Sequence, residues 1–172
     1  IVERLKELNI VPLTISYEYD PCDYLKAQEF QQKRDDPSWK KSKQDDLDNM
    51  KTGSWGKKGH IHYQPAPCIN AWLDTLAHLP KAEFFTEVAQ RMDREIHKGY
   101  MLFPGNYVAL DLLQGNTAHQ SHYSAADKER FEKYIQERID MIPLPNKDVP
   151  FLREKLLAMY ANPVINKENA VG

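Results

Sequence analysis

The sequence predicts a mixed α/β fold, in which a small remnant sheet of two to three strands packs against a larger C-terminal helical lobe. Apolar and polar residues alternate with a period of two in Ile10–Tyr19 and in His60–Gln64, which is typical of β-strands. Beyond Lys81 the apolar residues recur at helical spacing, beginning with Phe84 and Val88. Two or three strands followed by four helices would be an odd complete fold, because strands of a parallel sheet need neighbours on both sides. We therefore expect that a larger sheet has lost its first half and that the chain is a piece of a longer one.

The N-terminal elements follow in order along the chain. Residues 1–8 have the apolar spacing of a short helix, and the strand at Ile10–Tyr19 stops at Pro21. Asp23 is a candidate N-cap for a helix over Tyr24–Lys33, because its carboxylate can accept the free N–H groups of a first turn.

The segment Ser38–Gly59 is rich in lysine and glycine. Ser42 and Asp45 have the spacing of a capping box, which predicts a short helix within residues 42–51. From Gly53 onward we expect a loop that leads into the second strand.

Helical signals dominate after Pro67. Ser124 and Asp127 repeat the capping-box spacing, and Pro150 suits the first turn of a helix. The tail after Pro163 is expected to fray. The expected helices are Lys81–Lys98, Pro104–Leu113, Ser124–Ile139 and Asp148–Tyr160.

Composition places the chain among globular proteins and favours a cytosolic setting. With 28% charged and 10% aromatic residues it is neither disordered nor fibrous, and a net charge of −2 argues against a dedicated nucleic-acid binder. Cys22 and Cys68 do not make a disulfide framework and are expected to be reduced thiols. No apolar run has the length that a bilayer-spanning helix needs.

Two histidine patterns raise catalytic hypotheses. His60 and His62 would project from the same side of a strand and could ligate zinc, but no further ligand is recognisable nearby. We therefore expect no metal site and keep a metal-dependent hydrolase only as an alternative. His122 and Asp127 have the spacing of a base and its orienting carboxylate, but the capping box already accounts for Asp127, so no catalytic residue is expected here.

The segment Trp39–Lys58 is a candidate surface for docking on a bilayer. It holds six lysines, three aspartates and two tryptophans. Lysines attract anionic head groups and tryptophans favour the membrane interface, so Lys57, Lys58 and Trp55 are the candidate head-group residues. The alternative is a solvated charged loop in which Trp39 and Trp55 pack into the core.

Ordered blocks along the chain carry a family resemblance. They begin with "NIVPLTISYEYDP", which contains Val11 and Pro12, and continue with "GKKGHIHYQPAPCIN", "REIHKGYMLFPGNYVALDLL", "YSAADKERFEKYI" and "YANPV". Together they resemble the lysophospholipid acyltransferase family, with Val11 and Pro12 at its I-V-P strand, Ala66 where a glycine is usual, and the later blocks matching a helical C-terminal extension of a bacterial subgroup. The resemblance implies a remnant of the acyltransferase α/β domain at 1–70 and a helical extension at 71–172.

The catalytic blocks of that family are missing from this chain. In the family, a histidine held by an aspartate deprotonates the acceptor hydroxyl, which attacks an acyl thioester on coenzyme A or acyl carrier protein. The Asn-His-x-x-x-x-Asp and Glu-Gly-Thr-Arg-Ser blocks precede the I-V-P strand there, and neither occurs here. The resemblance therefore implies the C-terminal part of a phospholipid-biosynthesis acyltransferase, inactive by itself, without a cofactor, and cytoplasmic or peripheral on the inner face of the membrane.

The same resemblance suggests which residues would line the acceptor cleft. They are Pro12, Ser16 and Glu18, because the I-V-P strand lines that cleft in the family and these residues share one side of the strand. The rival hypothesis is a non-catalytic lipid-binding or partner-binding module whose likeness to acyltransferases is only ancestral.

Overall fold

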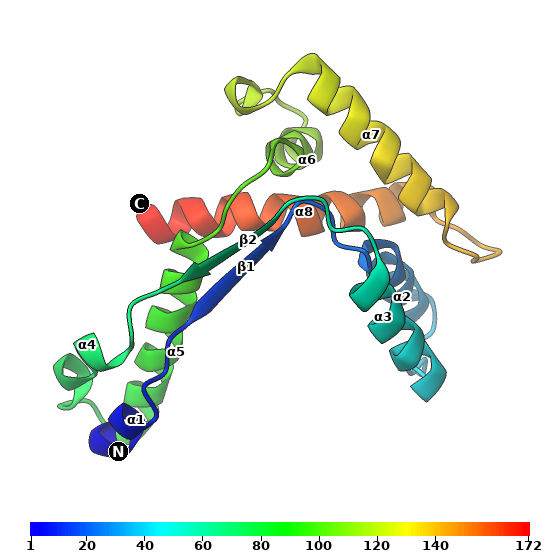
Figure 1. The fold of residues 1–172 in the computed structure, drawn as a ribbon. Coiled ribbons are helices and arrows are strands. Elements are labelled where there is room, and N and C mark those ends of the chain that lie inside the picture. The colour runs from blue at the N-terminus through cyan, green and yellow to red at the C-terminus, as the bar shows by residue number, and fades with distance from the viewer. The chain divides into compact units, whose positions relative to one another are not determined.

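The computed structural model describes all residues, Ile1–Gly172, and is mostly helical with one small sheet (Figure 1). The chain forms two compact units, each assembled from separated segments. Unit 1 comprises residues 1–16, 61–101 and 165–172, and unit 2 comprises residues 17–60 and 102–164. The expected mixture of a small sheet and dominant helices is confirmed, whereas the domain division at residue 70 stays a prediction.

The sheet has two antiparallel strands, β1 (Leu13–Tyr17) and β2 (Ile61–Pro65). Beyond the strand ends the Ala66 N–H donates to the Pro12 C=O at 2.9 Å, which continues the pairing. β1 is shorter than its predicted range at both ends, and β2 begins and ends one residue later than predicted. Small differences of this kind are common at the ends of elements.

The polar side of β1 faces inward and its apolar side is exposed. The Thr14 hydroxyl donates to the Ile96 C=O at 2.8 Å, so the inward side lies along helix α5 (Lys81–Lys98), as Figure 1 shows. Leu13 and Ile15 on the opposite side are 49% and 42% exposed. The alternation therefore predicts the strand correctly, but its apolar residues do not mark the buried side.

The hydrophobic core of unit 1 forms where α5 meets three short helical elements. One face of α5 brings Phe84 and Val88 into this core, as its predicted spacing requires. The short elements are α1 (Val2–Glu7), α4 (Asn70–Leu73) and the 3-10 helix η1 (Asp74–Leu76). The other buried core residues are Ile69, Leu73 and Leu76, with Val2, Leu5, Ile10, Trp72, Leu79 and Met92 packed around them.

Unit 2 is a helical assembly in which α7 packs against α6 and α2. Its elements are α2 (Asp23–Asp35), α3 (Lys43–Trp55), α6 (Pro104–Gln114), the 3-10 turn η2 (Gln120–His122), α7 (Ala125–Asp140) and most of α8 (Val149–Val171). The apolar stripe of α7, Phe131, Ile135 and Ile139, is fully buried. Buried residues of α6 and α8, Val108, Ala109, Leu110, Leu152, Leu156 and Leu157, complete the core.

Two helices extend further than the sequence predicts. α3 continues over Gly53, which lies against Cys22, and the Cys22 thiol donates to the Asn49 C=O at 3.4 Å. This contact with the start of α2 keeps the segment helical where a loop was expected. α8 continues through Pro163 instead of fraying, because the fully buried Val164 anchors the next turn although the proline removes one backbone hydrogen bond.

Candidate functional site

The residues predicted to line an acceptor cleft lie in different surroundings. Pro12 and Ser16 are on the buried side of β1, where the Ser16 Oγ accepts the Met101 N–H at 3.1 Å. Glu18 follows the strand, where its Oε2 accepts the His60 backbone N–H at 3.0 Å. The assignment of these residues to an acceptor site stays a prediction.

His60 pairs with a carboxylate. Its ring Nδ1 lies 2.8 Å from the Glu18 Oε2, and its own side chain is 83% exposed. Burial opposes ionisation of Glu18, but the hydrogen bonds from His60 outweigh it and lower the pKa of Glu18. The chain holds no group of three or more His, Cys, Asp or Glu placed to bind a metal, so the structure brings no third ligand to the His-x-His pattern.

The His122–Asp127 spacing does not form a catalytic pair. The Asp127 carboxylate accepts the N–H and the hydroxyl of Ser124 at 2.9 and 2.7 Å, and the Ser124 Oγ accepts the Asp127 N–H at 3.1 Å. The His122 ring stacks instead on Tyr107, with the ring centres 4.1 Å apart. The predicted capping box is therefore confirmed, and Asp127 serves the start of α7.

A histidine–carboxylate pair without a sequence motif joins α6 to the segment that contains η2. The buried Asp111 carboxylate lies 2.8 Å from the His119 Nδ1 and accepts the Tyr123 hydroxyl at 2.8 Å. Burial opposes ionisation, but these hydrogen bonds outweigh it and lower the pKa of Asp111. The one local sequence feature that favours this pairing is Gly115, whose φ of 66° lets the chain turn back after α6 and bring His119 to Asp111.

A second buried carboxylate, Asp23, holds α2, α7 and α8 together. It is the first residue of α2 and not its N-cap, a position that Cys22 occupies, so the predicted capping role is wrong. Its Oδ2 accepts the Tyr134 and Tyr160 hydroxyls at 2.6 and 2.7 Å, and its Oδ1 accepts the Arg138 Nε–H. Burial raises the pKa of both tyrosines, so their hydroxyls stay protonated and donate.

A cavity of about 510 Å³ lies beside this cluster, between α2, α3 and α7. Gly56 forms part of its wall at a point where the Cβ of any other residue would collide with Pro21, so the end of α3 can approach the turn before α2. Four of the five charged side chains that line it are cationic. These five are Lys57, Arg130, Lys133, Glu137 and Arg138, and the tyrosines are Tyr19, Tyr24 and Tyr134.

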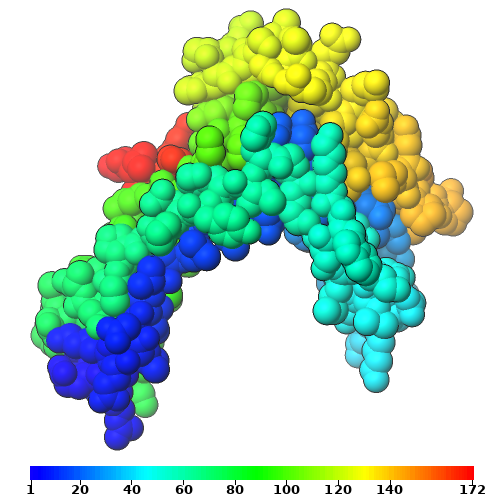
Figure 2. All heavy atoms as spheres, viewed as in Figure 1, coloured from blue at the N-terminus to red at the C-terminus, as the bar shows by residue number.

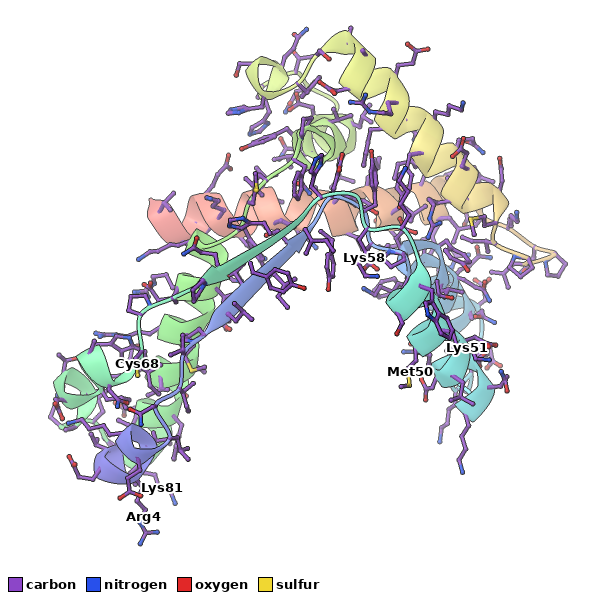
Figure 3. All side chains as sticks on the ribbon, in the orientation of Figure 1. Arg4, Met50, Lys51, Lys58, Cys68 and Lys81 are labelled. Carbon is purple, nitrogen blue, oxygen red and sulfur yellow. The ribbon has the colours of Figure 1, made fainter.

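α3 has no buried residue and presents apolar side chains to solvent. Leu47, Met50 and Trp55 are 51%, 69% and 82% exposed. Figure 2 shows α3 (cyan) uncovered on the side in view, and Figure 3 shows Met50 directed away from the helix. The alternative that both tryptophans pack into the core is therefore wrong for Trp55, whereas Trp39 is half-buried, with the Lys33 ammonium 6.0 Å from its ring centre.

The two lysines after α3, Lys57 and Lys58, make different contacts. Lys57 is exposed, lines the cavity and has no carboxylate partner. The Lys58 Nζ donates to the Ser54 and Gly56 C=O groups at 3.1 and 3.2 Å, which satisfies free carbonyls at the end of the helix. Lys57 is therefore the more available cation for an external anion.

No helix combines the length and the apolar character that crossing a bilayer demands. Comparisons with protein-family models, with curated proteins and with solved structures find no match for this chain. Its function is therefore inferred from its own residues and geometry and from the resemblance of its sequence blocks.

Proposed function

We propose that the chain is the C-terminal portion of a bacterial phospholipid-biosynthesis acyltransferase, and that it docks the parent protein on the membrane. The parent transfers an acyl group from acyl-CoA or acyl carrier protein to a lysophospholipid or glycerol-phosphate acceptor. The ordered sequence blocks that begin at Val11 and Pro12 support the family, and the exposed side of α3 supports the docking role. The same proposal has the protein act in the cytoplasm, peripherally on the inner face of the membrane.

The distribution of side chains around α3 carries the docking proposal. Successive residues of an α-helix lie about 100° apart, and one arc of about 140° on α3 contains three exposed apolar side chains and two lysines. We call five residues of this arc the docking face: Lys43, Leu47, Met50, Lys51 and Trp55. Gln44 and Ser54 lie in the same arc. The aspartates of the helix, Asp45, Asp46 and Asp48, all lie outside it. Exposed apolar side chains alternate with lysines on this arc, although Asp48 lies only about 20° beyond it, next to Trp55. Such a mixture of apolar and cationic groups can contact an anionic bilayer.

Vesicle flotation tests the docking role. The chain should bind vesicles that contain phosphatidylglycerol more than purely neutral ones, and Trp55→Ala should weaken binding about tenfold because interfacial burial of its ring is lost. A double change of Lys43→Gln and Lys51→Gln should flatten the salt dependence, since each lysine near the surface contributes about 1 kcal/mol that salt screens. Phe30→Ala is the matched control, because Phe30 is 50% exposed on α2, outside the docking face. Equal binding to neutral and anionic vesicles, or none to either, would remove the proposal.

An acyl-transfer assay tests the non-catalytic role. Incubated with acyl-CoA or acyl carrier protein and lysophosphatidate, the chain alone should form no product above background, since a general base is worth about 10²–10⁴-fold and its His122 has no orienting carboxylate. Turnover that His122→Ala abolishes would contradict this expectation.

The coding sequence upstream of Ile1 tests the family assignment. We expect it to encode the Asn-His-x-x-x-x-Asp block and then the Glu-Gly-Thr-Arg-Ser block. If both blocks are missing, the acyltransferase assignment falls. A non-catalytic lipid-binding module then remains, and the docking face supports that alternative by itself.

A further inference from the structure

The cavity between α2, α3 and α7 is lined by four cationic side chains, and only one of them is paired with a buried carboxylate. Arg138 is not available to a ligand, because its Nε–H is donated to Asp23 and its Nη2–H to the Pro21 C=O at 2.6 Å. The buried carboxylate balances its charge. The cations left to meet a ligand are Lys57, Arg130 and Lys133.

These remaining cations are weakly held. Lys57 has no carboxylate partner, and the Lys133 Nζ is 4.0 Å from the Glu137 Oε1, in a pair whose side chains are 78% and 61% exposed. Arg130 pairs with Asp127, but its side chain is 63% exposed. Exposed ion pairs contribute little to stability, so an anion with more than one charge can replace these partners at small cost.

The rest of the wall supplies apolar surface and the hydroxyl of Tyr19, which also interacts with Arg130 and Glu18. Burial raises the pKa of Tyr19, so its hydroxyl stays protonated at neutral pH. Pro21 and Met141 add apolar surface beside the cations. A volume of about 510 Å³ exceeds what a bare phosphate fills and lies within the usual range of small-ligand sites, about 300–1,000 Å³.

We infer that this cavity binds a phosphomonoester carried by a small organic group. A phosphomonoester has a charge of about −1.5 to −2 at neutral pH and three acceptor oxygens, which matches the three available cations. A phosphodiester has one charge and two such oxygens, so it satisfies fewer of them. A soluble organic phosphate and a phosphatidate-type lipid head group share this chemistry. The inference goes beyond the docking role and does not depend on the acyltransferase assignment.

Calorimetric titration of the whole chain with sn-glycerol 3-phosphate, and with inorganic phosphate for comparison, tests the site in solution. Lys57→Gln and Lys133→Gln should each weaken binding about tenfold, as expected for loss of a charge-assisted hydrogen bond. Glu137→Gln should instead tighten binding, because it removes the competing carboxylate and releases Lys133. Lys81→Gln is the matched control, since it makes the same charge change on α5, outside both the cavity and the docking face.

Vesicles distinguish the two sources of the phosphate. Vesicles with phosphatidate and with phosphatidylglycerol are matched in surface charge, and binding of the chain to each is compared. A preference for phosphatidate that Lys57→Gln abolishes and Lys81→Gln leaves intact assigns the site to a lipid head group. Binding of sn-glycerol 3-phosphate without that preference assigns it to a soluble phosphate.

Two outcomes would overturn the inference. One is that the chain binds neither sn-glycerol 3-phosphate nor phosphatidate in preference to phosphatidylglycerol. The other is that Lys57→Gln and Glu137→Gln change affinity no more than Lys81→Gln does. Both outcomes leave Trp55-dependent binding to phosphatidylglycerol untouched, so this site and the docking role fail separately.

Discussion

Helices α3 and α7 begin with the same local signal. In α3 the Ser42 Oγ accepts the Asp45 N–H at 3.1 Å and the Asp45 carboxylate accepts the Ser42 N–H at 2.8 Å. In α7 the Ser124 and Asp127 groups make the same pair of bonds at 3.1 and 2.9 Å. The two starts are therefore equivalent in chemistry and nearly equivalent in geometry.

The two helices then place their apolar residues in opposite environments. α7 buries Phe131, Ile135 and Ile139, whereas α3 buries nothing and leaves Leu47 and Met50 more than half exposed. A capping box thus determines where a helix begins but not what it packs against. Because the apolar side of α3 has no partner within unit 2, it is free to contact another surface.

The largest effect that separates the two helices should come from truncating one apolar residue in each. Ile135→Ala should lower the free energy of unfolding by about 2–5 kcal/mol, because it leaves a cavity in the core. Leu47→Ala should change it by no more than about 0.5 kcal/mol, because Leu47 is 51% exposed. Urea denaturation followed by circular dichroism measures both, and similar losses for the two variants would mean that α3 packs as α7 does.

Removing the capping serines should have a smaller and more local effect. Ser124→Ala should cost about 1 kcal/mol in the free energy of unfolding, because α7 is part of the core of unit 2. Ser42→Ala should chiefly speed amide hydrogen exchange in α3, since that helix can open without exposing buried residues. If Ser42→Ala lowered global stability as much as Ser124→Ala, the proposed independence of α3 would be wrong.

The smallest effect should be a pH dependence of each cap. Hydrogen bonds from Ser42 and Ser124 lower the pKa values of Asp45 and Asp127. A carboxylate whose folded pKa lies below its unfolded value of about 3.9 stabilises the fold above that pH, and this contribution is lost as the pH falls through the folded pKa.

Acid titration of the two cap variants checks this sign. On acidification below about pH 4, the unmodified chain should lose more stability than Asp127→Asn, whose cap no longer titrates. For Asp45→Asn the difference should appear only in the helicity of α3. Identical acid sensitivity in the unmodified chain and Asp127→Asn would show that the ionised cap does not stabilise α7.

Only part of the candidate site can be predicted from the sequence. Trp55 and Lys57 stand out because tryptophan and lysine are concentrated in one short segment. Met50 does not, because its exposure depends on which side of α3 meets α2, and that is decided where Gly53 lies against Cys22. The cavity could not be predicted either, because its cations come from the end of α3 and from α7, which are far apart in the sequence.

The sequence alone determines the short-range interactions. The two capping boxes and the apolar stripes of α5 and α7 involve residues within a few turns of one another, so their spacing is visible in the sequence and the structure confirms them. Tertiary structure alone decided which side of an element is buried. β1 turns Thr14 inward because the Ile96 C=O of α5 accepts its hydroxyl. Asp23 is buried and accepts several hydrogen bonds because α7 and α8 bring Tyr134 and Tyr160 to it. The partners in these contacts are distant in the chain, and only folding brings them within hydrogen-bond range.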